Sequence, residues 1–399
     1  MAFNLTSIYR MQNPIQNYAW GSKDAFTLMY GVANPEDKPQ AEIWMGAHPN
    51  GCSSLVDENG ETIRLDAFIA NDPAAILGDA HANFGELPYL FKVLAAAEPL
   101  SIQVHPDKAS SEAGFAAENA AGIPLTAAHR NFKDPNHKPE LVYALTPYRA
   151  MNGFREFSDI VSLIQSLKLP ALQAEIDAFC QNPQSDTLKA LFGVSLRVQG
   201  EARSATVAAL LAVAKERQSE DAFAEVLRLS AFYPEDMGLF APLLLNVITL
   251  QPGESMFLYA STPHAYLQGV GLEAMASSDN VLRAGLTPKH MDVDALLANV
   301  DFVAKPANEL LMKPMVLGPV SDYPIPVADF SFTLVNLANE ALESETTTAL
   351  ILFCAEGHAV VKSGKQTLTL QAGESCFVPA AASAFAVSGQ GKLVQIGSR

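Results

Sequence analysis

The sequence predicts a mainly β protein, built as two antiparallel β-barrels of the jelly-roll type and one inserted helical domain. Short strand-like segments, broken by Gly, Pro and Asn, fill residues 8–155 and return after residue 242. Between residues 157 and 229 the apolar residues instead recur at helical spacing. A short sequence motif near residue 250 recurs near residue 370. Together these observations predict two related β-domains and a helical insertion.

The first strand-rich region contains one expected helix, over residues 65–77. The helical block that follows begins with Ile160, Val161, Ile164 and Leu167, which lie on one face of a helix. Its long polar faces favour a packed cover over a second catalytic unit. A final β-region is expected to start near residues 316–326.

The repeat relates two parts of the chain at a constant offset. LQPGESMFLYA at residues 250–260 matches LQAGESCFVPA at residues 370–380, an offset of 120. A Gly-centred turn between strands could recur by chance. The offset places Ala384 opposite His264 and Ala386 opposite Tyr266. We therefore predict one active barrel and one purely structural barrel.

These patterns divide the chain into three parts. Residues 1–155 and 240–315 are expected to form a discontinuous catalytic barrel, and residues 156–239 a helical insertion. Residues 316–399 are expected to form the C-terminal structural barrel.

Composition limits the classes of partner. The chain has 399 residues, 49% of them hydrophobic, which allows two or three domains with sizeable cores. Its formal net charge of −17 argues against nucleic acid and anionic membranes as partners, because repulsion would oppose association. A small anionic ligand remains compatible with this charge if cations are concentrated locally.

The sequence favours a cytoplasmic protein. Residues 1–10 lack a basic region followed by an apolar core, and residues 205–214, the most apolar stretch, are too short to span a bilayer. The four cysteines are far apart without CxxC spacing, which is typical of free thiols in a reducing compartment.

Three fragments carry metal-ligating side chains: SIQVHP at residues 101–106, NHKPE at residues 136–140 and PHAY at residues 263–266. In an extended first fragment Ser101, Gln103 and His105 share one face, because side chains alternate along a strand. With Glu140 and His264 they supply an amide oxygen, a carboxylate and two imidazoles. Antiparallel barrels of the jelly-roll and cupin type bring such distant ligands into one mouth.

Each histidine taken alone is more often a hydrogen-bonded structural residue than a ligand. The prediction of a metal site therefore rests on the combination of Gln103, His105, Glu140 and His264. His48 and His81 have no spacing partner and are interpreted as structural.

Two longer segments carry a family resemblance. HAYLQGVGLEAMASSDNVLRAGLTPK at residues 264–289 resembles the long signature of type I mannose-6-phosphate isomerases, and FKDPNHKPE at residues 132–140 resembles their other signature. The one departure is Phe132, where the family usually has Tyr. YAWGS at 18–22, AEIWMG at 41–46 and LPYLFK at 87–92 are also similar to family segments.

The resemblance implies a zinc enzyme that interconverts mannose 6-phosphate and fructose 6-phosphate. The family's metal ligands fall on Gln103, His105, Glu140 and His264, the same four residues that the fragments had indicated. Because oxygen ligands also suit Mn²⁺ and Co²⁺, those ions are potential substitutes for Zn²⁺. We expect a monomer that binds a small sugar phosphate.

Proton transfer between C1 and C2 of a sugar needs a base, a group that stabilises the enediolate and a phosphate anchor. Arg283 resembles the family's catalytic arginine, and Glu273 and Asp279 are the candidate bases, Glu273 being favoured. Either carboxylate could equally be an ion-pair partner of Arg283 or Lys289. Lys138 shares a strand face with Glu140 and could donate to the substrate, whereas His137 points the other way. For the phosphate, the resemblance points to the following two residues: Ser101 and Lys92.

Two other classes of protein remain open at this point. A metal-dependent cupin oxygenase usually has several His ligands for iron, whereas Gln103 and Glu140 favour non-redox chemistry. A noncatalytic sugar-phosphate-binding cupin would not need Arg283, Lys138 and Glu273.

Overall fold

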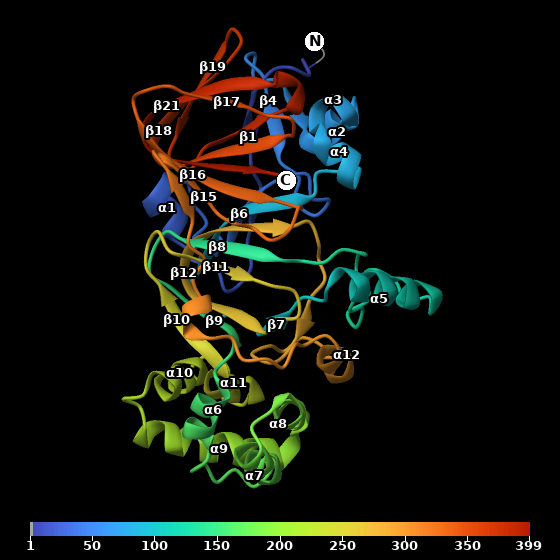
Figure 1. Cartoon of the computed structure of the whole chain (residues 1–399), viewed down its shortest axis with the longest axis vertical. Helices are drawn as coiled ribbons and strands as arrows, with labels where there is room; N and C mark the ends of the chain where they lie inside the picture. The colour runs from blue at the N-terminus through green and yellow to red at the C-terminus, as the bar shows by residue number, and fades with distance from the viewer. Residues whose placement is uncertain (1–2) are drawn as a thin grey trace.

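Two β-sheets and a helical layer are stacked along the length of the molecule (Figure 1). The structure is a computed structural model that describes residues 3–399. The chain is mainly β with a helical insertion, as the sequence predicted. Within the described range no helix has the length and apolar character needed to cross a membrane.

The first sheet has ten strands and occupies the middle of the molecule (Figure 1). Its strands are β2 (Ile15–Gln16), β3 (Glu42–Met45), β6 (Tyr89–Ala96), β7 (Gln103–Val104), β8 (Glu140–Ala144), β9 (Tyr148–Phe154), β10 (Leu245–Leu250), β11 (Ser255–Leu258), β12 (His264–Ala276) and β13 (Leu282–Arg283). The long strand β12 pairs with β6, β7, β8 and β9, all antiparallel. Strands from both sides of the helical insertion therefore meet at β12.

The register of β12 brings distant polar residues together. His264 lies opposite Gln103 of β7, Glu273 opposite Lys92 of β6, and Met275 opposite Glu140 of β8. Because paired residues across antiparallel strands lie about 4.5–5.5 Å apart, this register fixes the positions of the candidate site residues.

Both faces of β6 are buried, and the two faces serve different purposes. Phe91 and Val93 point into a cluster shared with the second sheet, and the Phe91 ring lies 5.8 Å from that of Phe353. Lys92 points to the opposite face of the sheet. The alternation explains why a lysine is found between two core residues.

The second sheet has eleven strands and includes the C-terminal part of the chain. Its C-terminal strands are β14 (Met315–Leu317), β15 (Val320–Asp322), β16 (Ser331–Ala338), β17 (Leu342–Glu345), β18 (Leu350–Ser363), β19 (Gln366–Gln371), β20 (Ser375–Val378) and β21 (Ala384–Gly397). Three N-terminal strands complete it: β1 (Tyr9–Gln12), β4 (Ser54–Val56) and β5 (Thr62–Arg64).

These three strands pair within the second sheet, whereas the predicted division placed residues 1–155 in the first barrel. Strand β1 pairs with β20, with Tyr9 opposite Phe377, and buries Ile8 and Tyr9 against the second sheet. Strand periodicity predicts which residues are buried but not which sheet edge the strand joins.

The internal repeat corresponds to equivalent strands in the two sheets. Strands β11 and β20 begin at Ser255 and Ser375, and β12 and β21 begin at His264 and Ala384. Both pairs keep the offset of 120. Where the first copy has a buried imidazole, the second has an exposed Ala384.

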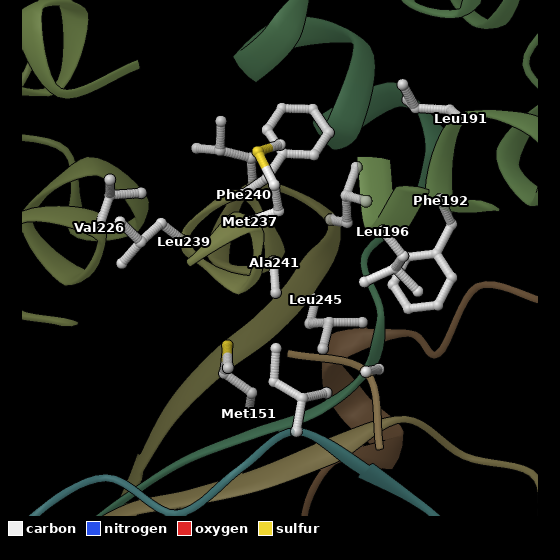
Figure 2. Packing of buried hydrophobic residues seen from close by; sticks show 14 of the residues in the cluster. Met151, Leu191, Phe192, Leu196, Val226, Met237, Leu239, Phe240, Ala241 and Leu245 are labelled. Carbon is white, nitrogen blue, oxygen red and sulfur yellow. The ribbon is translucent and has the colours of Figure 1, made fainter. Parts of the chain in front are cut away.

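The helical layer lies between β9 and β10 in the sequence and packs below the first sheet (Figure 1). It comprises α6 (Phe157–Ile164), α7 (Gln173–Gln181), α8 (Ser185–Arg197), α9 (Gly200–Glu216), α10 (Asp221–Ser230), the 3-10 helix η1 (Met237–Phe240) and α11 (Ala241–Leu244). Figure 2 shows Leu196 of α8 and Phe240 of η1 packed near Met151 of β9 and Leu245 of β10. The layer shares its core with the sheet and therefore covers it.

The remaining helices are shorter connections, apart from α5. They are α1 (Ala25–Tyr30), α2 (Leu65–Ile69), α3 (Pro73–Leu77), α4 (Asp79–Phe84), α5 (Lys108–Ala120), α12 (Val293–Ala298), and the 3-10 helices η2 (Ala307–Glu309) and η3 (Ala380–Ala382). The single helix predicted over residues 65–77 is two helices, because Pro73 disfavours a helical Asp72, which instead caps α3 through Ala75. Helix α5 was not predicted.

Candidate metal centre and active site

Three of the four predicted metal ligands converge inside the first sheet. One potential ligand atom from each of His105, Glu140 and His264 lies within 4.8 Å of the others, and all three residues are buried. The distance from His105 Nε2 to Glu140 Oε1 is 3.2 Å, and that from His264 Nε2 to Glu140 Oε2 is 3.6 Å. Each imidazole therefore directs Nε2 towards the carboxylate.

Hydrogen bonds to the other ring nitrogens fix the orientation of both imidazoles. His105 Nδ1 lies 2.7 Å from the carbonyl of Asn280, and His264 Nδ1 lies 2.8 Å from that of Thr262. A carbonyl only accepts, so Nδ1 carries the proton and Nε2 keeps its lone pair. His105 Nε2 is buried with no hydrogen-bond partner. A buried imidazole nitrogen that faces a carboxylate and has no hydrogen-bond partner is typical of a metal ligand.

Gln103, the fourth predicted ligand, lies on the short strand β7 directly opposite His264. Its Nε2 is 3.4 Å from Ser101 Oγ, a long contact that leaves Oε1 as the potential ligand atom. Ser101, Gln103, Glu140 and His264 all line one cavity, of about 50 Å³. Ile102 and Val104 point the other way, into the core shared with the helical layer, as the predicted alternation requires.

Glu140 is surrounded by hydrogen-bond donors and basic groups. Lys138 Nζ lies 3.2 Å from Oε1, and the hydroxyl of Tyr266 donates to Oε2 at 2.6 Å. Burial alone would raise the pKa of Glu140, but the positive charge of Lys138 holds it well below its usual range. The carboxylate therefore stays ionised and available to a metal.

A second buried ion pair lies in the same cavity. Lys92 Nζ donates to Glu273 Oε2 at 2.7 Å and lies 3.9 Å from Glu42. Burial opposes the charge on Lys92, but Glu273 and Glu42 raise its pKa, so the amine stays protonated. Burial raises the pKa of Glu273, with the opposing charge of Lys92 as the next influence. The predicted base thus pairs with Lys92, whereas Arg283 and Lys289 were the partners considered from the sequence.

Asp279, the other candidate base, does not line this cavity. Its Oδ1 lies 3.4 Å from His48 Nε2, and its Oδ2 accepts from Asn50 at 3.1 Å. Burial would raise the pKa of Asp279, but the hydrogen bond and charge of His48 lower it below the usual range. Nothing in the sequence indicated this contact of His48, because the two residues lie 231 positions apart. His137 points away and lies 3.0 Å from Asp329.

Arg283 and two lysines form a cluster of cations near the donor set. Arg283 lies opposite Gln103 in the β7–β13 pair, and burial lowers its pKa. Partial burial, followed by the charges of Arg283 and Lys133, lowers the pKa of Lys289. In residues 3–399 none of these three side chains forms an ion pair with a carboxylate within 4.0 Å. The cluster is therefore a positive site without a close carboxylate partner among the described residues, and the sequence interpretation did not include Lys133 or Lys289 in it.

The sequence interpretation also missed Asn280, whose hydrogen bonds connect the two signature segments. Asn280 Oδ1 accepts from the backbone of Lys133, and its Nδ2 donates to the carbonyls of Asp134 and Asn136. Its own carbonyl holds His105, so Asn280 orients one candidate ligand and the loop that leads to another. The sequence offered one signal for this role, an asparagine inside the long signature.

The fold and these side chains define a cupin-type protein with a preformed donor set for one divalent metal. Three family models match the chain: the catalytic domain of type I phosphomannose isomerase over residues 8–157, its helical insertion domain over 163–245 and the mannose-6-phosphate isomerase cupin domain over 320–397. The chain belongs to the type I phosphomannose isomerase family.

Characterised relatives match nearly the whole chain. The mannose-6-phosphate isomerase of Salmonella typhimurium is 55% identical over 97% of this chain and 98% of its own length. The human mannose-6-phosphate isomerase is 33% identical over 94% of this chain and 93% of its own. A crystal structure of the Salmonella typhimurium enzyme bound to fructose 6-phosphate and zinc has a TM-score of 0.94 at 54% identity, and covers 98% of this chain and 100% of its own.

The buried imidazoles predict how metal binding depends on pH. Burial, followed by the charge of His105, lowers the pKa of His264 to about 4. Because protonation blocks ligation, protons should compete with the metal at His264 only as the pH approaches this value, and not from about 6.5 as for an exposed imidazole. We expect zinc affinity, measured by chelator competition, to stay constant from pH 7 to about pH 5. A tenfold loss of affinity per pH unit starting at pH 6.5 would contradict the assigned environment of His264.

Proposed function

We propose that this protein is a zinc-dependent isomerase that interconverts D-mannose 6-phosphate and D-fructose 6-phosphate by proton transfer between C1 and C2. The observation that carries the proposal is the cavity in which Gln103, Glu140 and His264 lie beside a buried Lys92–Glu273 pair. The relatives' names and the fructose 6-phosphate bound to the Salmonella typhimurium enzyme support the same substrate class.

We assign Gln103, His105, Glu140 and His264 as the ligands of one metal ion. Two neutral imidazoles, one amide and one carboxylate leave a Zn²⁺ site with a net charge of about +1. When bound, the ion supplies Lewis-acid polarisation of a sugar oxygen. Mn²⁺ and Co²⁺ would be accepted by the same oxygen ligands.

Glu273 is the proposed base that moves the proton. Its raised pKa makes it a better proton acceptor near neutral pH than Asp279, whose pKa is lowered. Glu273 Oε2 is occupied by Lys92, so Oε1 is the oxygen that we assign to the transfer. Lys138, beside Glu140, can donate to the enediolate oxygen that develops, and Arg283 remains the proposed second cation for that charge.

The phosphate anchor that we favour is the cation cluster of Arg283, Lys289 and Lys133, with Ser101 as a hydroxyl donor. Lys92 was the other candidate from the sequence. Because Glu273 and Glu42 already neutralise Lys92, a dianionic phosphate beside it would face two carboxylates. We therefore propose that Lys92 holds the base and that the phosphate lies towards Arg283.

Replacing Lys289 with alanine should raise KM for mannose 6-phosphate by roughly 10- to 100-fold, the range expected for losing a hydrogen bond to a charged group. The anchor holds the phosphate alike in ground and transition states, so kcat should change little. Steady-state kinetics test this, with Lys313→Ala as a control because Lys313 is an exposed lysine that does not line the candidate cavity. An unchanged KM in Lys289→Ala would indicate that Lys92 and Ser101 bind the phosphate instead.

An assay of the metal-loaded and chelator-treated protein with each sugar phosphate tests the proposed function. Isomerisation that stops on metal removal and resumes on zinc addition is the expected result. Binding without turnover would indicate a sugar-phosphate-binding cupin, and oxygen consumption would indicate an oxygenase.

We also propose that the chain is a cytoplasmic monomer with a small-molecule substrate and no nucleic-acid partner. The net charge of −17 and four free cysteines support this. We further propose the division into a helical insertion at 156–239, flanked by the parts of the catalytic barrel up to 155 and from 240 to 315, and a structural barrel at 316–399. Strands β1, β4 and β5 are the exception already described.

A further inference from the structure

The loop of residues 284–289, which follows strand β13, has a disfavoured backbone conformation. Leu286 has a φ of +52°, in the left-handed region that bulky side chains rarely adopt, and Gly285 before it has a φ of +112°. The side chain of Leu286 is fully buried in the core that the first sheet shares with the helical layer. A conformation of this kind persists only where the surrounding contacts hold it.

Asp236 of the helical insertion supplies such contacts. It lies at the N-cap of η1, and its Oδ1 accepts from the backbone N–H of Gly238 at 2.6 Å. The same Oδ1 accepts from the N–H of Leu286 at 2.9 Å, and Oδ2 accepts from the N–H of Thr287 at 3.1 Å. Because hydrogen bonds to an ionised group are stronger than neutral ones, this carboxylate is a firm attachment for the loop.

Two glycines allow the loop and η1 to approach closely. A Cβ added at Gly238 would lie 2.7 Å from the backbone nitrogen of Leu286, and one added at Gly285 would lie 2.7 Å from the Cα of Gly238. Figure 2 shows Leu239 and Phe240, the next residues of η1, packed in the core between the helical layer and the sheet. The helical layer therefore presents Asp236 to the loop from a fixed position.

The loop connects two members of the cation cluster. Arg283 is the last residue of β13, directly before the loop, and Lys289 lies at the other end of the loop. The backbone N–H of Lys289 donates to Thr287 Oγ1 at 3.1 Å, so the residue that Asp236 holds in turn holds Lys289. The positions of both cations therefore depend on one carboxylate of the helical layer.

We propose that Asp236 is a positioning residue, which holds the 284–289 loop so that Arg283 and Lys289 converge on the phosphate of the substrate. The helical insertion, interpreted from the sequence as a packed cover, thereby acquires a part in substrate binding. This effect on binding rests on the proposed phosphate anchor, whereas the attachment of the loop to Asp236 does not.

Hydrogen–deuterium exchange of the zinc-loaded full chain tests the attachment. Asp236→Asn keeps the shape of the side chain but replaces one acceptor oxygen by an amide group that only donates, so at least one bond to the loop is lost. We expect the backbone amides of Leu286 and Thr287 to exchange at least about tenfold faster in this variant, measured by mass spectrometry with fragmentation to single residues. Unchanged exchange would overturn the proposal.

Steady-state kinetics test the effect on binding. In Asp236→Asn the KM for mannose 6-phosphate should rise roughly tenfold with little change in kcat, because a displaced anchor weakens ground and transition states alike. When Asp236→Asn is combined with Lys289→Ala, KM should rise by less than the product of the two single effects, since both changes act on one anchor. Effects that multiply in full would overturn the proposal.

Asp72→Ala is the matched control. Asp72 also caps a helix by accepting a backbone N–H, but α3 lies at the opposite end of the molecule from the helical layer (Figure 1). Its KM should stay unchanged, and an equal rise would mean that KM reports only a general loss of stability, which would contradict the role of Asp236.

The affinity for inorganic phosphate, measured by calorimetry, separates this inference from the proposed isomerase activity because it needs no turnover. It should fall roughly tenfold in Asp236→Asn. A parent protein that binds phosphate without isomerising sugars would refute the isomerase and leave the phosphate affinities to decide the role of Asp236. An active parent whose Asp236→Asn variant keeps the parental KM and phosphate affinity would refute the role of Asp236 alone.

Discussion

Replacing His264 with alanine is expected to remove both the bound metal and the isomerase activity. The variant would leave three protein ligands and a space where a buried imidazole faces Glu140. We expect less than about a tenth of an equivalent of zinc after dialysis and a loss of turnover of at least about 10³-fold, because the site depends on a complete ligand shell. Metal analysis and the isomerase assay measure the two effects.

His137→Ala is the matched control for this variant. His137 is also an imidazole of the candidate signatures, but its Nε2 lies 3.0 Å from Asp329 and it is not part of the donor group. The His137→Ala variant should retain one equivalent of metal. Full metal retention by His264→Ala would show that the ligand assignment is wrong.

The change Ala384→His in the repeat should create no second metal site, because the described donors cluster only in the first sheet.

The second large effect concerns the base. Glu273→Gln should keep the metal and still bind substrate, because the amide is nearly isosteric and Glu273 is not an assigned ligand. Turnover should fall by roughly 10² to 10⁴, the usual contribution of a positioned general base. Steady-state kinetics together with metal analysis separate this outcome from a damaged metal centre.

Glu42→Gln separates proton transfer from charge compensation. Glu42 also lies within ion-pair distance of Lys92, at 3.9 Å, and is buried like Glu273. If the base is Glu273, the Glu42 variant should lose much less turnover. Equal losses in both variants would mean that the carboxylates act only by holding Lys92. A large loss confined to Asp279→Asn would move the base to Asp279.

The order of strand-like and helix-like segments predicted the architecture because the hydrophobic patterns that mark them are local in the sequence. Ile102 and Val104 alternate with polar residues, and the two copies of the LQxGES phrase mark equivalent turns before β11 and β20. The sheet that β1 joins depends instead on the fit of Tyr9 against Phe377, more than 360 residues away. No local pattern contains that information.

The convergence of His105, Glu140 and His264 could be predicted because each of these proposed ligands lies in a short motif with a strong chemical preference. The Lys92–Glu273 pair could not, because the two residues lie on separate strands and meet only through the register of β12 with β6. The same holds for the His48–Asp279 contact. The cation cluster was missed because Lys133 and Lys289 have no distinctive neighbours in sequence and become significant only beside Arg283.

Solvent exchange at C2 tests most directly whether one metal centre and Glu273 carry out proton transfer. Mannose 6-phosphate would be incubated in deuterium oxide with the zinc-loaded protein, the metal-free protein and Glu273→Gln, and the C2 proton signal followed by nuclear magnetic resonance. We predict loss of that signal with the zinc-loaded protein, and at least about 10²-fold slower loss with the other two. Equally rapid exchange in the metal-free protein or in Glu273→Gln would contradict the account.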